Sequence, residues 1–314
     1  MLINKLLNIK YPIIQGAMTG ISCGKFAAAI SNAGALGVIA TGGLLIDEIK
    51  EEIRICKSLT NNPFGINIYM LSPIVNEIVD LLIEEKIKIV TTGAASAISI
   101  IKRLKEADIL VFPVTSSVTL AKRMEKYGVG GIIVEGMESG GHVGYDTTMS
   151  LLVQMKKELN IPIIAAGGIA NGSQLISVLS MGAIGIQLGT VLLATKECPI
   201  HNNYKKIVVM AKDNDTVIIG HGLNRVRVYK NKAAKEILKM NQMDINEDLS
   251  KVLLAIKDGD LDNGIFLVGQ IAGLVDEILP IEKLFKKIII EAVDLEGDII
   301  NNISVLKECE WDVI

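Results

Sequence analysis

IPIIAAGGIANGSQLISVLSMGAIGIQLGT, residues 161–190, is the stretch of sequence that decides the fold. It holds two apolar runs, which end in Gly-Gly and in Gly-Thr, and between them a segment of helical spacing that begins at Ser173. It belongs to a run of 35 residues without a charge, Ile161 to Thr195, which is long enough to cross a bilayer. Pro162 and the glycine turns interrupt any single span, so we interpret the stretch as strand, helix and strand buried in a globular protein.

The same unit of strand and helix recurs through the first two thirds of the chain. Eight apolar runs end in glycine or a small polar residue, at successive spacings of 21 to 32 residues. The runs are nearly continuous rather than alternating, as is typical of parallel strands covered by helices. We therefore predict an α/β fold, a (β/α)8 TIM barrel over residues 1–212, with a doubly wound open sheet as the alternative because periodicity does not show closure. The expected strands lie in residues 13–18, 36–41, 64–68, 87–93, 110–115, 131–136, 161–168 and 184–190, and expected helices span 47–58, 73–85, 96–106, 117–127 and 173–180.

The regular alternation of predicted strands and helices ends at about residue 212. The remaining residues show helical patterns separated by Asp, Gly and Asn turns, and we predict a C-terminal α-helical cap over residues 213–314 that packs over the barrel mouth. A cleft between the barrel and this cap is the expected binding site. The expected cap helices span residues 233–242, 249–257, 265–279 and 281–307.

Composition excludes several classes of protein. Of 314 residues, 50% are hydrophobic and 4% aromatic, so the chain is globular and has no aromatic platform for single-stranded nucleic acid. The 32 basic and 35 acidic residues give a net charge of −3. The chain therefore lacks the excess of positive charge that favours binding to nucleic acid or to an anionic membrane surface. We expect no nucleic-acid partner and no membrane association.

The N-terminus and the cysteines favour a cytoplasmic protein. Lys5 and Lys10 interrupt the apolar residues at the N-terminus, so we predict no signal peptide. The four cysteines form no CxxC pair and have no histidine at metal-ligand spacing, so we expect free thiols in a reducing compartment and no metal site.

Glycines after the seventh and eighth strands indicate a phosphate site. In a barrel the functional face lies at the carboxyl ends of the strands, and phosphate sites commonly use the last two strand ends. Gly167 and Gly168 follow the seventh strand, and Gly189 and Thr190 follow the eighth. Glycine lets backbone N–H groups approach a phosphate, and the alternative is that these glycines only make tight turns.

His142 is the candidate catalytic residue. It stands in GMESGGHVG, residues 136–144, a glycine-rich loop after the sixth strand. An imidazole at the barrel mouth can act as a general acid or base, or donate to a developing oxyanion, and the alternative is a loop histidine with a structural role. His201 we predict to be structural, and His221 stays undecided.

Amides and carboxylates at other strand ends carry weaker signals. Asn67 and Gln15 can bind the polar edge of a heterocycle or serve only the backbone, and both alternatives stay open. Glu135 and Glu138 form a paired carboxylate only if Glu138 is not a solvated loop residue. The sequence has no GxxxxGK[ST] loop, no HExxH and no Ser-His-Asp order, so it gives no sign of a P-loop nucleotidase, a zinc protease or a serine hydrolase.

Seven motifs together resemble one family. The chain is similar to FMN-dependent barrels of the nitronate monooxygenase and type II enoyl-acyl-carrier-protein reductase (FabK) family, and VGQIAGLV near the C-terminus favours the reductase branch. The motifs lie in the expected order over almost the whole chain: KYPIIQGAM (10–18), PFGIN (63–67), VTTGA (90–94), VEGMESGGHVG (134–144), IPIIAAGGIA (161–170), QLGT (187–190) and VGQIAGLV (268–275).

The resemblance implies FMN as cofactor, with its phosphate on the glycines after the last two strands and its ring at the strand ends opposite. It also implies that His142 is the active-site histidine. The implied cofactor-binding residues are Gly16, Ala17, Met18, Asn67, Glu135, Gly141, Ala166, Gly167, Gly168, Gln187, Gly189 and Thr190.

In the reductase branch, NADH or NADPH reduces FMN, and the flavin passes hydride to an enoyl thioester of acyl carrier protein or coenzyme A. His142 then stabilises or protonates the developing enolate. In the monooxygenase branch, the alternative, an alkyl nitronate is oxidised with dioxygen. We also expect a homodimer in the cytoplasm.

Some mouth residues depart from the family pattern. The reductase branch usually has GGM followed closely by Trp where this chain has Ala17, Met18 and Thr19, and it usually has an Arg where this chain has Val191. It also usually has GAGNP where Ala95 and Ser96 occur here. These departures bear on the substrate, and they leave open a barrel that binds flavin without activity.

Overall fold

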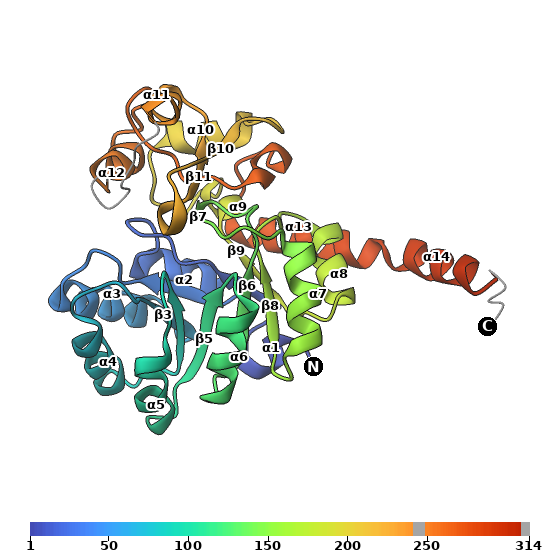
Figure 1. Ribbon diagram of the computed structural model, residues 1–314, viewed down its shortest axis with the longest axis horizontal. Helices are drawn as coiled ribbons and strands as arrows, with labels where there is room; N and C mark the ends of the chain where they lie inside the picture. The colour runs from blue at the N-terminus through green and yellow to red at the C-terminus, as the bar shows by residue number, and fades with distance from the viewer. Residues whose placement is uncertain (241–248, 309–314) are drawn as a thin grey trace.

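The computed structural model of the chain describes residues 1–240 and 249–308. Eight parallel strands form a barrel with helices around it (Figure 1), in the order β1-β9-β8-β6-β5-β4-β3-β2. The strands are β1 (Ile13–Gln15), β2 (Gly37–Ala40), β3 (Phe64–Tyr69), β4 (Ile89–Gly93), β5 (Leu110–Thr115), β6 (Ile132–Glu135), β8 (Ile163–Ala166) and β9 (Ile186–Leu188). The helices around them are α1 (Ile3–Leu7), α2 (Gly24–Asn32), α3 (Ile46–Leu59), α4 (Val75–Glu84), α5 (Ile98–Glu106), α6 (Val118–Lys126), α7 (Thr148–Glu158) and α8 (Gly172–Ser180). All eight predicted strands and the five predicted helices are present.

The barrel closes between β1 and β2, the two ends of the strand order. A parallel bridge joins Ile14 to Leu36, and the backbone N–H of Gln15 donates to the carbonyl of Leu36 at 2.9 Å. An open sheet would leave its two outermost strands unpaired with each other. The barrel prediction is therefore confirmed, and the open-sheet alternative is wrong.

Inward-facing apolar side chains fill the barrel. They come from six strands and form one buried cluster together with Ile3 and Leu7 of α1. The N–H of Ile3 donates to the carbonyl of Ile184 at 2.7 Å, so α1 closes the amino-terminal end of the barrel. Figure 1 shows α1 at the end away from the elements that follow the barrel. The inward cluster includes Ile14, Val38, Ile89, Phe112, Ile133 and Ile164.

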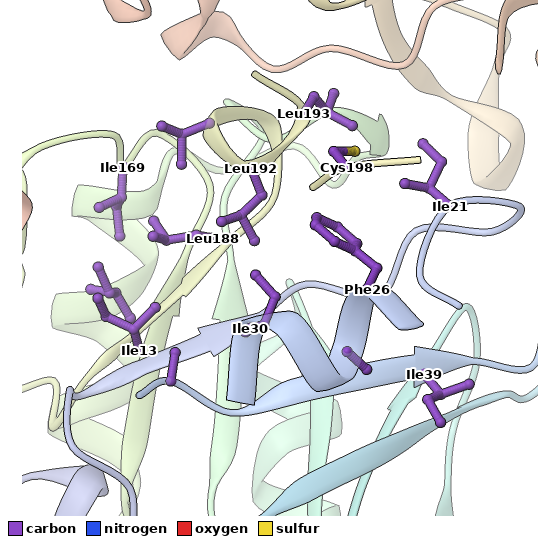
Figure 2. Packing of buried hydrophobic residues seen from close by; sticks show 14 of the residues in the cluster. Ile13, Ile21, Phe26, Ile30, Ile39, Ile169, Leu188, Leu192, Leu193 and Cys198 are labelled. Carbon is purple, nitrogen blue, oxygen red and sulfur yellow. The ribbon is translucent and has the colours of Figure 1, made fainter. Parts of the chain in front are cut away.

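Outward-facing side chains of the same strands pack against the helices. Because successive strand residues point to opposite faces, Ile13 joins this outer layer where Ile14 joins the interior. In Figure 2, Phe26 and Ile30 of α2 face Leu188 of β9 in this layer. The strands are thus apolar on both faces, which explains their nearly continuous apolar runs.

Residues after the barrel form an appended region, 213–240 and 249–308 of the described chain. It follows α9 (Thr190–Leu193) and α10 (Asn202–Met210) and lies above the barrel mouth in Figure 1, apart from its last two helices. Its elements are β10 (Thr216–Ile219), η1 (Gly222–Asn224), β11 (Val226–Tyr229), α11 (Lys232–Met240), α12 (Leu249–Lys257), η2 (Gln270–Leu274), α13 (Ile281–Asp294) and α14 (Glu296–Glu308). The predicted domain boundary at residue 212 stays a prediction.

The appended region contains the predicted helices in part and also strands that we did not predict. Strand β11 pairs with β10 on one side and with β7 (Gly141–His142), on a barrel loop, on the other. Local periodicity does not reveal such a distant partner. The predicted helix over 265–279 is wrong, because only the short 3-10 helix η2 forms there. At Gly269 an added Cβ would lie 2.8 Å from the carbonyl of Glu138, so this segment runs directly against a barrel loop.

Two other helix boundaries differ from prediction. The expected helix over 281–307 is two helices, α13 and α14, which meet at Leu295. The last two residues of the expected helix over 233–242 lie outside the described residues. Within the described chain, no helix combines the length and the apolar character needed to cross a bilayer.

Phe112 tests the packed barrel interior. Its side chain is fully buried in the inward cluster. We expect Phe112→Ala to lower the free energy of unfolding by about 3–5 kcal/mol, because it removes buried apolar surface and leaves a cavity. Urea unfolding measures the change. Leu110→Ala, on the same strand but 37% exposed, is the control and should cost less than about 1.5 kcal/mol; equal losses for both variants would contradict a filled interior.

Candidate active site

The inward-facing residues of the strands are apolar inside the barrel, and several are polar at the carboxyl ends of the strands, which form the barrel mouth. Ile133 and Ile164 face the interior, so Glu135 and Ala166, two residues further on, face the same way. Glu135 is paired in register with Ala166, and Ala166 with Gln187, so these three lie side by side on β6, β8 and β9. The structure therefore brings together residues that the sequence analysis placed at separate strand ends.

Asn67 lies on the opposite side of the mouth. It is an inward-facing residue two positions before the end of β3, and its Nδ2 donates to Oγ1 of Thr91 on β4 at 2.9 Å. This bond fixes the orientation of the amide and leaves its oxygen free to accept a bond from a ligand. Thr91, which the sequence analysis did not select, thus positions Asn67.

Glu135 is held in an environment that disfavours its charge. Desolvation by burial raises the pKa of its carboxyl to about 7, while the nearby Ser139 hydroxyl acts in the opposite direction. The group is therefore protonated in part at neutral pH, and it can donate as well as accept a hydrogen bond. A carboxyl of this kind can bind either a donor or an acceptor on a heterocycle.

The glycines after β8 bring backbone amides to one place. Gly167 and Gly168 have φ values of +82° and +74°, which only glycine adopts readily. A Cβ at Gly167 would lie 2.9 Å from the carbonyl of Gly136, whereas a Cβ at Gly189 would meet no atom within 4 Å. Open space therefore lies above Gly189, beside tightly packed loops.

Four backbone N–H groups around this space donate to no acceptor among the residues that the structure describes. They belong to Gly167, Gly168, Gly189 and Thr190, and we call them the amide cluster. Backbone N–H groups that face an open space without an acceptor fit a bound anion, such as the FMN phosphate that the resemblance implies.

The hydroxyl of Thr190 also links the barrel to the appended region. Its Oγ1 accepts from the N–H of Gly269 at 2.9 Å, so its own proton remains available to donate. The residues Gly16, Ala17 and Met18 lie next to this part of the mouth, because the N–H of Gly16 donates to the carbonyl of Leu188 at 2.7 Å. The N–H of Met18 donates to Oγ of Ser22 at 2.9 Å, which orders this loop.

His142 sits on β7, a strand that exists only through the appended region. It is paired in register with Val226 of β11, and the N–H of Val143 donates to the carbonyl of Arg225 at 3.1 Å. The side chain is exposed toward solvent, and desolvation by its surroundings lowers the pKa of the imidazole. A lowered pKa keeps His142 neutral at physiological pH, when it can both donate and accept a proton.

Glu138 anchors the loop between β6 and β7. Its carboxylate accepts from the N–H of Thr148 at 2.9 Å, at the start of α7, and the Thr148 hydroxyl donates to the carbonyl of Gly167 at 2.8 Å. Glu138 is thus neither a solvated loop residue nor the partner of Glu135. Arg227, which the sequence analysis missed, is buried and donates from Nε to the carbonyl of Met137 at 3.0 Å.

Gln15 and His201 have structural roles. The Gln15 amide donates to Oγ of Ser22 at 3.1 Å and accepts from the N–H of Val38 at 2.9 Å, so both its ends are bonded within the protein. Nδ1 of His201 accepts from the N–H of Asn203 at 3.1 Å and caps α10, as predicted. His221 is exposed, and its role stays undecided.

The barrel and its mouth define the class of protein: a (β/α)8 barrel with unpaired backbone amides after its last two strands and a histidine on the loop after β6. A family model described as nitronate monooxygenase matches residues 1–82 and 74–291. The chain therefore belongs to the nitronate monooxygenase family, and it is a flavin-dependent oxidoreductase.

Three known proteins illustrate the range of the similarity. The structure of FabK from Thermotoga maritima matches with a TM-score of 0.91 at 37% sequence identity, over 96% of this chain and 98% of that one. A probable nitronate monooxygenase of Staphylococcus saprophyticus is 32% identical over 68% of this chain and 73% of its own length. The (3aS,4S,5R,7aS)-5-hydroxy-7a-methyl-1-oxo-octahydro-1H-indene-4-carboxyl-CoA dehydrogenase of Mycobacterium tuberculosis is 27% identical over 93% of this chain and 95% of its own length.

Glu135 gives a prediction on pH and stability. Its folded-state pKa of about 7 lies above the ordinary 4.5, so the folded protein binds more protons than the unfolded chain between these values. The free energy of unfolding should fall as pH rises from about 5 to 8, and Glu135→Gln should be more stable than the wild type at pH 8 by about 1–3 kcal/mol. At pH 4, below both pKa values, the difference should nearly vanish. Urea unfolding of flavin-free protein at both pH values measures this, and a difference that does not depend on pH would contradict it.

Proposed function

We propose that the chain binds FMN and uses NADH or NADPH to reduce trans-2-enoyl thioesters of acyl carrier protein or coenzyme A. The observation that carries the proposal is the 37% identity to Thermotoga maritima FabK over nearly the full length of both chains. The histidine beside a polar ring and an amide cluster supports it, because this arrangement suits a flavin and a carbonyl substrate together. The assignment of the individual site residues is part of the proposal.

The residues present fit FMN. The amide cluster would hold the phosphate, and Asn67, Glu135 and Gln187 would bind the polar edge of the ring. Bound FMN would supply the hydride acceptor and donor that none of the twenty side chains provides. Gly16, Ala17 and Met18 would border the ring, and Ala166 and Gly141 leave room beside it.

His142 has the chemistry to complete the reduction. Hydride addition at the β-carbon of an enoyl thioester places negative charge on the thioester oxygen and the α-carbon. A neutral imidazole can donate a hydrogen bond to that oxygen and stabilise or protonate the enolate. The pairing of β7 with β11 would hold the imidazole in place for this step.

Nitronate oxidation with dioxygen is the second candidate. The family model and the Staphylococcus saprophyticus relative favour it. The two candidates differ in what reoxidises the flavin, so anaerobic turnover separates them. Purified yellow protein that oxidises NADH or NADPH anaerobically only when crotonyl thioester is added supports the reductase. Oxygen uptake with propionate 3-nitronate, without enoyl turnover, supports the monooxygenase, and flavin without either turnover indicates an inactive barrel.

Gly189 tests the phosphate site. A Cβ here would enter open space, so Gly189→Ala should leave the flavin-free fold intact and weaken FMN binding about tenfold or more by occupying the position of the phosphate. Fluorescence titration of flavin-free protein with FMN measures the affinity. Gly297→Ala, where a Cβ also meets nothing within 4 Å, lies on α14 and is the control. Unchanged FMN affinity in Gly189→Ala would move the phosphate elsewhere.

His142 is tested by turnover at constant flavin content. His142→Ala should keep the visible spectrum of bound FMN and lose about 10²–10³-fold in kcat with the enoyl thioester, since a general acid or oxyanion donor is gone. The rate at which NADH or NADPH reduces the flavin, measured by rapid mixing, should change much less than kcat. A variant that turns over normally would show that the histidine is structural.

A further inference from the structure

A pair of side chains beside His142 has no part in the site described so far. Arg225 is half-buried, and its guanidinium lies 4.0 Å from the centre of the Tyr145 ring. Tyr145 is 72% exposed, so the guanidinium covers one part of the ring and most of the rest is open. Large aromatic side chains this exposed are uncommon, and here the ring is held in a fixed orientation by a cation.

The pair is fixed relative to His142. Nη1 of Arg225 donates to the carbonyl of Gly144 at 3.1 Å, and its own carbonyl accepts from the N–H of Val143 at 3.1 Å. Tyr145 follows His142 by three residues on the same loop. Any ligand that contacts this pair therefore approaches the mouth beside the proposed catalytic histidine.

Two positively charged side chains, Arg225 and Arg227, lie near each other here. In the described residues, neither Arg225 nor Arg227 forms an ion pair with a carboxylate within 4.0 Å. Arg227 donates to the Met137 carbonyl and to the Thr216 hydroxyl. Desolvation by burial lowers its pKa, the charge of Glu138 acts in the opposite direction, and repulsion from Arg225 lowers it further. Within the described residues, the Arg225 side chain donates one hydrogen bond, to Gly144, and its other N–H donors can reach an anionic ligand.

We propose that Arg225 and Tyr145 form a subsite for the adenosine diphosphate group of a substrate, with phosphate on the guanidinium and adenine on the tyrosine ring. An arginine fork binds phosphate oxygens, and an exposed aromatic ring stacks on a base. The inference rests on the proposed function, in which two reactants, the nicotinamide dinucleotide and a coenzyme A thioester, carry this group. A thioester of acyl carrier protein carries the phosphate without the adenine.

The experiment is a fluorescence titration of the flavin-bound protein with N-methylanthraniloyl-ADP. Arg225→Gln should weaken binding about tenfold or more, since a charge-assisted hydrogen bond is lost. Tyr145→Leu should weaken it severalfold through lost stacking, and Arg225→Lys, which keeps the charge, should recover part of the affinity. The control is Lys230→Gln, which removes an exposed cation just after β11, the strand that Arg225 precedes. This variant should bind the probe as the wild type does.

Competition and kinetics identify the source of the group. If the subsite serves the dinucleotide, NADH or NADPH displaces the probe, and Arg225→Gln raises the KM for the dinucleotide and not the KM for the thioester. If it serves coenzyme A, CoA displaces the probe, and KM rises for crotonyl-CoA but not for crotonyl-pantetheine. Either result supports the subsite.

Two results would overturn the proposed subsite. One is an Arg225→Gln variant that binds the probe as tightly as the wild type does. The other is a wild-type protein that does not bind the probe at millimolar concentration. The titration needs no turnover, so its outcome is independent of the proposed reductase activity. Bound-flavin spectra of each variant report on the fold: an Arg225→Gln protein that keeps its flavin and loses the probe supports the subsite directly.

Discussion

Backbone pairing between β1 and β2 is the constraint on which the site depends. The N–H of Leu36 donates to the carbonyl of Ile13 and that of Gln15 to Leu36, both at 2.9 Å, and the Gln15 side chain accepts from Val38 on the neighbouring strand. Closure turns one face of every strand toward a common axis, so the last inward residues meet at the mouth. Without it, Asn67 and Gln187 would lie at distant positions of an open sheet.

The active site is assembled from two parts of the chain with different tasks. Barrel loops supply the amide cluster, where positive φ at Gly167 and Gly168 allows the loops to approach closely. The appended region orients the loop that carries His142, through the pairing of β7 with β11 and through Arg227. The amide cluster is therefore built from barrel loops, whereas the position of the histidine depends on residues some 80 positions later in the sequence.

Much of the fold was predictable because its signals are local. Each strand is an apolar run with a glycine or small polar residue at its end, and each helix has its own spacing, so all eight strands were found. The glycine turn after β8 was also recognisable, because Gly167 and Gly168 directly follow an apolar run. Strands β10 and β11 were missed because they are four residues each, and outside their own hairpin only β11 has a partner, two residues of a distant loop. Two short β-branched runs around Gly220 and Gly222 were the available signal.

The sequence by itself determined the alternation of strand and helix, the glycine turns after β8 and β9, and the candidate histidine, because each depends on neighbouring residues. Only the tertiary structure decided the roles of buried polar groups. Gln15 and Glu138 had the residue types of a site, yet their hydrogen bonds to Val38 and Thr148 make them structural. Glu135 has no such bond to α7, and burial raises its pKa to about 7. A polar side chain's role is set by which partners the fold brings within hydrogen-bond distance, and those partners lie far away in the sequence.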